Sequence, residues 1–422
     1  KGYSYAQKCT ENFMQLISSS EVYKLINKKF PKKYIEAYFS KMIFYELLPI
    51  CHQITISNWD KKESKKRKII HTDTFLNSGH LKKILSDSDN YIFINKKKFL
   101  KKIKVKIISL FLPIYYKLLS LKNFLTKSKI DNNYDKKESF LAVCYARGIS
   151  ENKRSDLFWY YNFNENISNL ILYIQYPQMM RKYKEQKEIN SLIKNKKIKV
   201  IKIWEHDYSK KIESHSQLIN DLKKIGNINY FDKLLLKKSI EMIKKIEFWQ
   251  NFFLSNKIKV HIDVHEMDND TLVKQIAITL IDGCSLGYNS SYISDVEGMH
   301  YKYYPNDIFF CWGQKGLNIM KKKISKKTET DIANILISGY PYTYFSEKSK
   351  TEIKKIKDQL TKNNVKFTIL FLDESSSDNS DYYDQLFPNK KLEIFYKFFF
   401  NWLVLDNEIG LIVKPKRNIK NL

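Results

Sequence analysis

The sequence predicts an α/β protein with two parallel-sheet domains that face a cleft, preceded by a mainly helical region. From Phe140 onwards, short and continuously apolar strands alternate with helical segments, which is typical of doubly wound parallel sheets. The same alternation restarts after Pro341. The expected domains therefore span 140–340 and 341–422, behind an N-terminal region of 1–139.

The N-terminal region carries apolar residues at helical spacing over 13–26 and 34–48, and a weak strand pattern over 91–95. The stretch 99–125 is apolar and basic, but charged residues and a proline interrupt it too often for a membrane-spanning helix. It fits an amphipathic helix on a membrane surface. A helix packed against the domain is the alternative.

In the first domain, strands are expected at 140–146, 170–177, 197–204, 259–267 and 308–313. A long helical region is expected over 211–255, and a further helix over 271–287 that Gly283 or Gly287 closes. The strand ILISGYP leads into the junction. There Gly339 is expected to belong to a hinge, and Tyr342 to touch a ligand between the domains.

The second domain is expected to contain a helix at 351–360, a strand at 366–375, a helix at 392–407 and a strand at 408–417. This order resembles that of the first domain but stops after one further strand. We therefore expect the second domain to be incomplete.

The chain of 422 residues has a formal net charge of +29. Its lysines are spread over the whole chain and Arg is scarce, whereas nucleic-acid interfaces favour Arg for bidentate base contacts. An anionic membrane surface or a phosphorylated substrate is therefore a better match than nucleic acid. The five cysteines are far apart and form no CxxC motif, which suits a reducing cytosol.

Ionisable residues lie at or after the ends of the strands of the first domain, at the edge where open α/β sheets bind their ligands. A carboxylate or a His in a partly buried cleft is suited to general-base catalysis. The candidates for this role are Asp156, Glu205, His206, His265 and Glu266. The alternative is that polar residues end these strands for structural reasons alone.

A metal site is considered and not predicted. His261, Asp263 and His265 alternate in one expected strand, so they share a face that would suit a divalent ion. However, HxDxH is not a specific signature, and a covering helix would close that face. Phosphate-binding glycine motifs are also absent, and the segment DGCSLG at 282–287 is expected to be a helix C-cap rather than a phosphate-binding turn.

Polar residues also stand at the carboxyl ends of the strands of the second domain. These residues are Asp373, Ser375, Lys414, Lys416 and Arg417. The basic cluster would face an anionic group such as the pyrophosphate of a sugar nucleotide. A basic surface loop is the alternative.

Several segments of the chain resemble bacterial surface-carbohydrate biosynthesis proteins, the capsule or O-antigen proteins of the glycosyltransferase B type. They are RGISENKRSDLFWYYN, LILYIQYP, YYPNDIFFCWGQKG, ILISGYPYTYF, LFLDES and IVKPKR. The resemblance implies two Rossmann-like domains, with the acceptor bound by the first, at Arg147 and Arg154, and a nucleotide-sugar donor bound by the second. The chain departs from the family where Lys414-Pro415-Lys416-Arg417 replaces Lys-Pro-His-Pro, and where 295–298 only approximates an acidic-acidic-Gly motif.

Together these expectations predict a glycosyltransferase that uses neither a metal nor a cofactor. It would be a peripheral protein at the inner face of the cytoplasmic membrane. It would move a sugar from a nucleotide sugar to a growing surface polysaccharide, such as capsule or lipopolysaccharide, or to a lipid-linked acceptor. Two alternatives stay open. One is a sugar-nucleotide epimerase or polyol-phosphate transferase on the same fold, and the other is a non-catalytic basic scaffold that binds membrane or nucleic acid.

Overall fold

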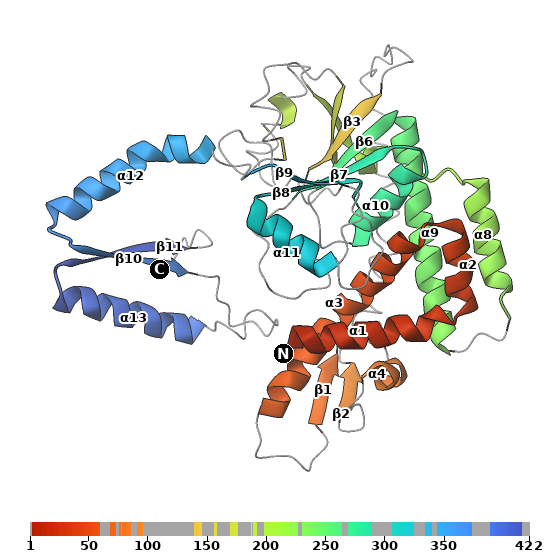
Figure 1. Cartoon of the computed structure of the whole chain (residues 1–422), viewed down its shortest axis with the longest axis horizontal. Helices are drawn as coiled ribbons and strands as arrows, with labels where there is room; N and C mark the ends of the chain where they lie inside the picture. The colour runs from red at the N-terminus through yellow and green to blue at the C-terminus, as the bar shows by residue number, and fades with distance from the viewer. Residues whose placement is uncertain are drawn as a thin grey trace. The chain divides into compact units, whose positions relative to one another are not determined.

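The computed structural model describes residues 2–59, 68–72, 76, 78–85, 91–95, 139–145, 156–157, 169–175, 187, 189–191, 198–226, 230–263, 269–288, 306–324, 334–339, 344–373 and 389–415. The chain divides into two compact units, Lys1–Pro341 and Tyr342–Leu422 (Figure 1). The first unit holds the large sheet, and the second holds a smaller α/β element.

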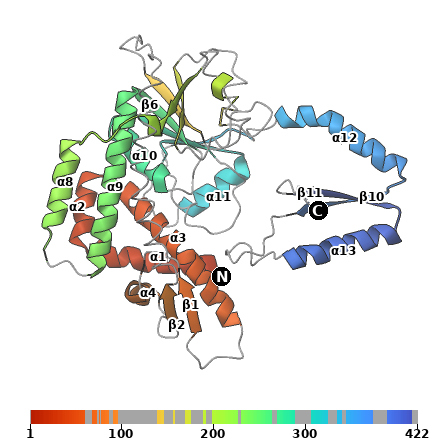
Figure 2. The same ribbon diagram turned by 180° about the vertical axis from the view of Figure 1, so that it is seen from behind.

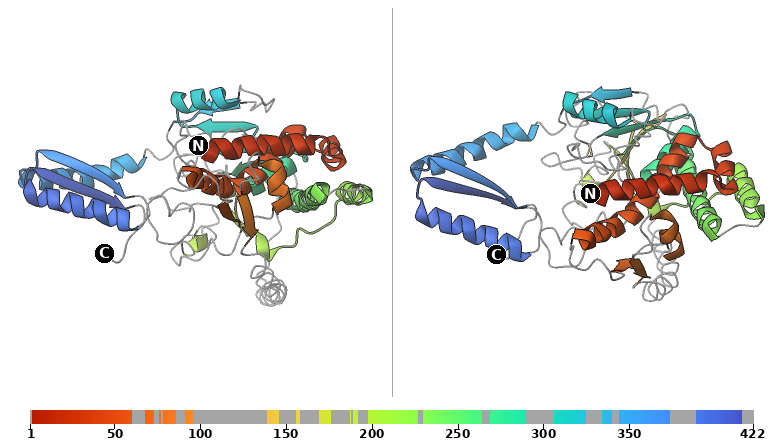
Figure 3. Two further views of the ribbon diagram at one scale, coloured as in Figure 1. Left: turned by 90° about the horizontal axis from the view of Figure 1, so that it is seen from below. Right: turned by 60° about the horizontal axis from the view of Figure 1, so that its bottom comes forward.

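The first unit begins with helices α1 (Gly2–Ser18), α2 (Glu21–Lys29) and α3 (Lys32–Trp59), followed by β1 (Lys68–Thr72), α4 (Ser78–Ile84) and β2 (Tyr91–Asn95). Helix α1 packs against α3 (Figure 3), and β1 pairs with β2 in parallel. The helical pattern predicted over 13–26 is confirmed but divides between two helices at Ser19 and Ser20.

One fully parallel sheet of seven strands forms the centre of the first unit, in the order β5-β4-β3-β6-β7-β8-β9. The strands are β3 (Phe140–Cys144), β4 (Leu170–Ile174), β5 (Lys199–Lys202), β6 (Ile258–Asp263), β7 (Cys284–Tyr288), β8 (Ile308–Cys311) and β9 (Asn334–Ile337). The later helices of the unit include α8 (Glu213–Lys224), α9 (Tyr230–Ser255), α10 (Asn269–Thr279) and α11 (Gln314–Ile324). The predicted α/β class with a parallel, Rossmann-like sheet is confirmed.

Successive residues of each strand point to opposite faces of the sheet. On one face, Ala142, Cys144 and Tyr173 join a core that includes α9, α10 and the N-terminal helices. On the other face, Val143 and Leu172 belong to a separate core. Figure 2 shows α9 and α10 beside β6 from behind. Both faces of the central strands are therefore buried, as their continuously apolar sequences require.

The N-terminal helices share this core with the sheet. The hydroxyl groups of Tyr34 in α3 and Thr279 in α10 lie 3.2 Å apart and form a hydrogen bond. The ring of Phe13 in α1 lies 5.4 Å from that of Phe231 in α9. The helical region and the sheet are therefore parts of one packed unit.

The predicted helix over 271–287 is wrong in its second half, because α10 ends at Thr279 and 284–288 is strand β7. The helix closes at Asp282, which has a left-handed φ of 54°, and the amide of Gly283 donates to the carbonyl of Ile278 at 3.0 Å. This geometry is a Schellman cap. A Cβ at Gly283 would lie 2.9 Å from the carbonyl oxygen of Lys259, so only glycine fits there.

The long helical region predicted over 211–255 also divides, into α8 and α9. The predicted segment 99–125 lies outside the described residues. None of the helices that the structure describes is long and apolar enough to cross a membrane.

The second unit consists of α12 (Tyr344–Lys362), β10 (Phe367–Asp373), α13 (Asn389–Leu405) and β11 (Ile409–Pro415), which confirms the predicted element order. Strands β10 and β11 pair in parallel, with Asp373 beside Pro415. The ring of Phe371 in β10 packs against Phe399 of α13, 5.1 Å between centroids. The carboxyl ends of both strands therefore lie side by side.

Replacement of Phe252 by Ala is expected to destabilise the first unit by about 3–5 kcal/mol, because it leaves a cavity in a closed core. The Phe252 ring is fully buried in α9 and contacts Trp249 and Tyr173 at 5.5 and 5.2 Å. Urea unfolding followed by tryptophan fluorescence measures the change. The matched control is Leu254→Ala in the same helix, which is 56% exposed and should change stability by less than about 0.5 kcal/mol. Equal effects of the two substitutions would contradict the packing described.

Candidate functional site

The strand order creates a topological switch point between β3 and β6. From β3 the chain continues to β4 on one side, and from β6 it continues to β7 on the other, yet β3 and β6 are paired neighbours. The connections that leave these two strands therefore diverge. In open α/β sheets, ligands bind in the crevice outside the strand ends at such a point.

A buried ion pair lies at this switch point. Asp263 is the last residue of β6, and its Oδ2 lies 2.8 Å from Nζ of Lys274 in α10. Each side chain is only 1% exposed. Lys274 Nζ also lies 3.7 Å from Sγ of Cys144, the last residue of β3. One ammonium group thus connects the carboxyl ends of both central strands.

Aromatic rings enclose this ammonium group. Lys274 Nζ lies 4.9 Å from the ring centroid of Trp249 and 5.5 Å from that of Tyr173. The negative faces of such rings attract a cation, and the attraction is larger where water is excluded. The rings and Asp263 therefore replace the water that a buried lysine loses.

A second polar contact lies beside the ion pair. The hydroxyl of Tyr173 and Nε2 of His261 are 2.7 Å apart and share a hydrogen bond. Burial lowers the pKa of His261 to about 3, and the charge of Asp263 only partly opposes this effect. His261 is therefore a neutral imidazole at physiological pH.

Asp156 is the predicted catalytic candidate whose charge acts on this cluster. Its side chain is fully buried, and its negative charge contributes to the raised pKa of the Cys144 thiol. The main cause of that shift is burial, which raises the pKa of Cys144 to about 12. Cys144 is therefore a protonated thiol, which is unsuited to a nucleophilic role.

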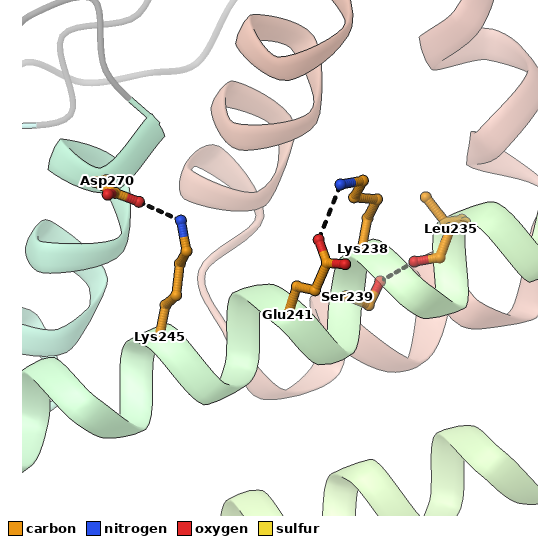
Figure 4. A network of polar contacts seen from close by, with 6 residues as sticks. All are labelled: Leu235, Lys238, Ser239, Glu241, Lys245 and Asp270. Atoms are coloured by element: carbon orange, nitrogen blue, oxygen red, sulfur yellow. Dashed lines mark hydrogen bonds and ion pairs between the residues drawn. The ribbon is translucent and has the colours of Figure 1, made fainter. Parts of the chain in front are cut away.

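The start of α10 is fixed at the same edge of the sheet. Asp270, in its first turn, forms an ion pair with Lys245 of α9 (Figure 4). Its other carboxylate oxygen accepts a 3.5 Å hydrogen bond from Gln175, which follows β4. Because a helix N-terminus carries a partial positive charge, Asp270 is also favourably placed on α10 itself.

The structure does not bring Glu205 and His206 to this cluster. Both follow β5, the edge strand, which is two strand spacings or roughly 10 Å from β3. Glu205 pairs with Lys202 at 3.1 Å on the surface. Burial lowers the pKa of His206, whose ring lies 5.9 Å from that of Tyr208.

Most other predicted site residues lie outside the described part of the chain. These are Arg147, Arg154, His265, Glu266, Tyr342, Ser375, Lys416 and Arg417. Gly339 follows β9 with a left-handed φ of 74°, which favours glycine. Asp373 and Lys414 lie at the adjacent carboxyl ends of β10 and β11, as the sequence predicts.

Two of the candidate metal ligands already make contacts with other side chains. His261 and Asp263 do share a face of β6, but Nε2 of His261 binds Tyr173 and Oδ2 of Asp263 binds Lys274. Within the described ranges, no group of three or more His, Cys, Asp or Glu side chains is placed to hold an ion.

Sequence reasoning missed Lys274, Tyr173, Trp249 and Cys144. The available signal was a lysine within the apolar segment TLVKQIAIT, four residues from Asp270. Comparison with models of known protein families and with curated proteins finds no match.

Replacement of Lys274 by Met is expected to destabilise the protein by about 3–5 kcal/mol, because it leaves the Asp263 carboxylate buried without its cation. Adding Asp263→Asn to this variant should recover part of the loss, since it removes the uncompensated charge. Lys224→Met, at an exposed ion pair on α8, is the control. Urea unfolding of the unmodified protein, the single variants Lys274→Met and Asp263→Asn, and the double variant gives the coupling energy. Additive losses would contradict a paired role.

The pKa of His261 predicts a dependence of stability on pH. The folded value, about 3, is below the ordinary value of 6.5, so the unfolded chain binds the extra proton between these values. The contribution of His261 to the free energy of unfolding is fully present above about pH 6.5. On acidification it is lost by up to about 1.4 kcal/mol per pH unit. In His261→Gln, urea unfolding at pH 7 and pH 5 should show about 2 kcal/mol less loss than in the unmodified protein. Identical losses in the two proteins would argue against a buried neutral imidazole.

Proposed function

We propose that the chain is a metal-independent glycosyltransferase that moves a sugar from a nucleotide sugar to a surface polysaccharide or lipid-linked acceptor. The observation that supports this proposal most is the switch point between β3 and β6, where a desolvated polar cluster lies below the strand ends. Ligands of Rossmann-like sheets bind at this position. The residues directly after the two strands include two arginines, a histidine and a glutamate.

The acceptor side of the reaction belongs to the first unit. Arg147 and Arg154 follow β3 and are suited to hold a charged or polyhydroxylated acceptor. His265 and Glu266 follow Asp263 within three residues, so the Lys274 ion pair fixes the strand from which they depart. Either of them, or Asp156, is our candidate for the general base. Glu205 and His206 are less well placed, because they follow the edge strand.

The donor side belongs to the second unit. The paired ends of β10 and β11 bring the backbone of Asp373 and Lys414 to one edge, and Ser375, Lys416 and Arg417 follow there in the sequence. Cationic side chains at strand ends suit the phosphate groups of a nucleotide. They would offset the charge that develops on the leaving phosphate.

The reaction balances without a further reagent. The base removes the proton of an acceptor hydroxyl, whose oxygen forms a bond to the anomeric carbon of the donor sugar. The bond between that carbon and the phosphate oxygen breaks, and its electron pair leaves with the nucleotide. A polysaccharide acceptor under synthesis would place the protein at the inner face of the cytoplasmic membrane, where the net charge of +29 favours anionic lipid.

The decisive experiment incubates the purified protein with CMP-, UDP-, GDP- and CDP-linked sugars and measures binding, and then transfer to cell-envelope glycan. The double variant Lys416→Ala, Arg417→Ala should weaken donor binding at least tenfold. A control with the same loss of charge is Lys354→Ala, Lys357→Ala on the exposed side of α12. His265→Ala and Glu266→Ala should reduce transfer and leave donor binding unchanged. Absence of both binding and transfer with all four donor classes would refute the proposal.

A further inference from the structure

A pocket of about 390 Å³ opens among the helices of the first unit. The turn between α1 and α2, helix α4, the end of α8 and the start of α9 form its walls. In Figure 1, α2 and α8 lie at the right and α4 lies below them, whereas β3 and β6 lie at the top. Small-molecule sites usually have volumes of about 300–1,000 Å³, so this pocket is large enough for a ligand.

Ser20 is the most informative residue among those that line this pocket. Ser20 precedes α2 and is 9% exposed, but its side chain makes no capping hydrogen bond. Its Oγ is buried and has no hydrogen-bond partner in the part of the chain that the structure describes. A buried polar group without a partner costs about 1–3 kcal/mol. Rotation of this side chain toward the pocket would let a ligand atom bond to Oγ and remove this cost.

The other polar groups of the pocket carry both signs of charge. Lys83 supplies an ammonium group, whereas Glu21 and Asp232 supply carboxylates. The N-terminus of α2 favours an anion, but two carboxylates against one ammonium oppose it. A hydroxyl group both donates and accepts hydrogen bonds, so it satisfies all of these side chains. Phe231 adds an apolar wall for the C–H face of such a ligand.

We propose that this pocket binds a small polyhydroxylated molecule of one or two sugar rings. A free sugar and the terminal sugar of a glycan present the same hydroxyl groups to it. The pocket uses none of the strand-end residues assigned to the transferase reaction. Sugar binding here therefore stands or falls independently of that function.

The test is a ligand-observed NMR titration of the full chain with glucose, galactose, N-acetylglucosamine and inorganic phosphate. Gly226→Phe is the blocking variant, because Gly226 lines the pocket and a Cβ there meets no atom within 4 Å. Gly313→Phe is the matched control, since a Cβ at that glycine, which follows β8, also meets nothing within 4 Å. At least one sugar should bind saturably to the unmodified protein and to the control, and at least tenfold more weakly to Gly226→Phe. Circular dichroism verifies that both variants fold.

Asp232→Asn and Ser20→Ala distinguish a sugar from an anion. Both substitutions should weaken sugar binding, because they remove a charged acceptor and the orphan hydroxyl. Phosphate binding that Asp232→Asn strengthens would overturn the proposal and assign the pocket to an anion. The absence of saturable sugar binding, or a sugar that Gly313→Phe displaces and Gly226→Phe does not, would also overturn it.

Discussion

Strand β6 pairs with β3 after the chain has added β4 and β5 on the opposite side, and the rest of the first unit follows from this pairing. It requires a long crossover, which α9 provides with 26 residues. It also makes β3 and β6 the central strands, covered on both faces, so their side chains have to be apolar or paired. The Lys274–Asp263 pair meets this requirement, because two aromatic rings and a carboxylate surround the cation.

A buried ion pair is weak evidence for stability, because the free-energy cost of desolvating two charges is close to the gain from their attraction. Its position is more informative. Lys274 reaches from α10 to the ends of both central strands, and Asp270 in the same helix reaches α9 and the end of β4. Lys274 and Asp270 of α10 thus hold the carboxyl ends of β3, β6 and β4 in place. The proposed transferase reaction would need its reacting groups on a rigid support, and this edge would supply one.

The sequence predicts the alternation of strands and helices well, because continuously apolar strands have a local signal. It misses β7, whose residues Cys284–Tyr288 include Ser and Gly and follow α10 after a short turn. That strand exists through its pairing with β6 and β8, which is not local. The residues of the candidate site likewise include some with a local sequence signal and some without one. Asp156 was predicted from its place after a strand, whereas Lys274 resembles any lysine on a helix until the fold buries it.

The burial of the Lys274–Asp263 pair also limits which substitutions the protein can accept during evolution. A substitution at either position alone passes through a state with one uncompensated buried charge, which costs a large part of the 5–15 kcal/mol that stabilises a typical domain. Neutral replacement of both positions avoids that state. Related chains should therefore retain both residues or have lost both, so that the two positions covary as one inherited unit.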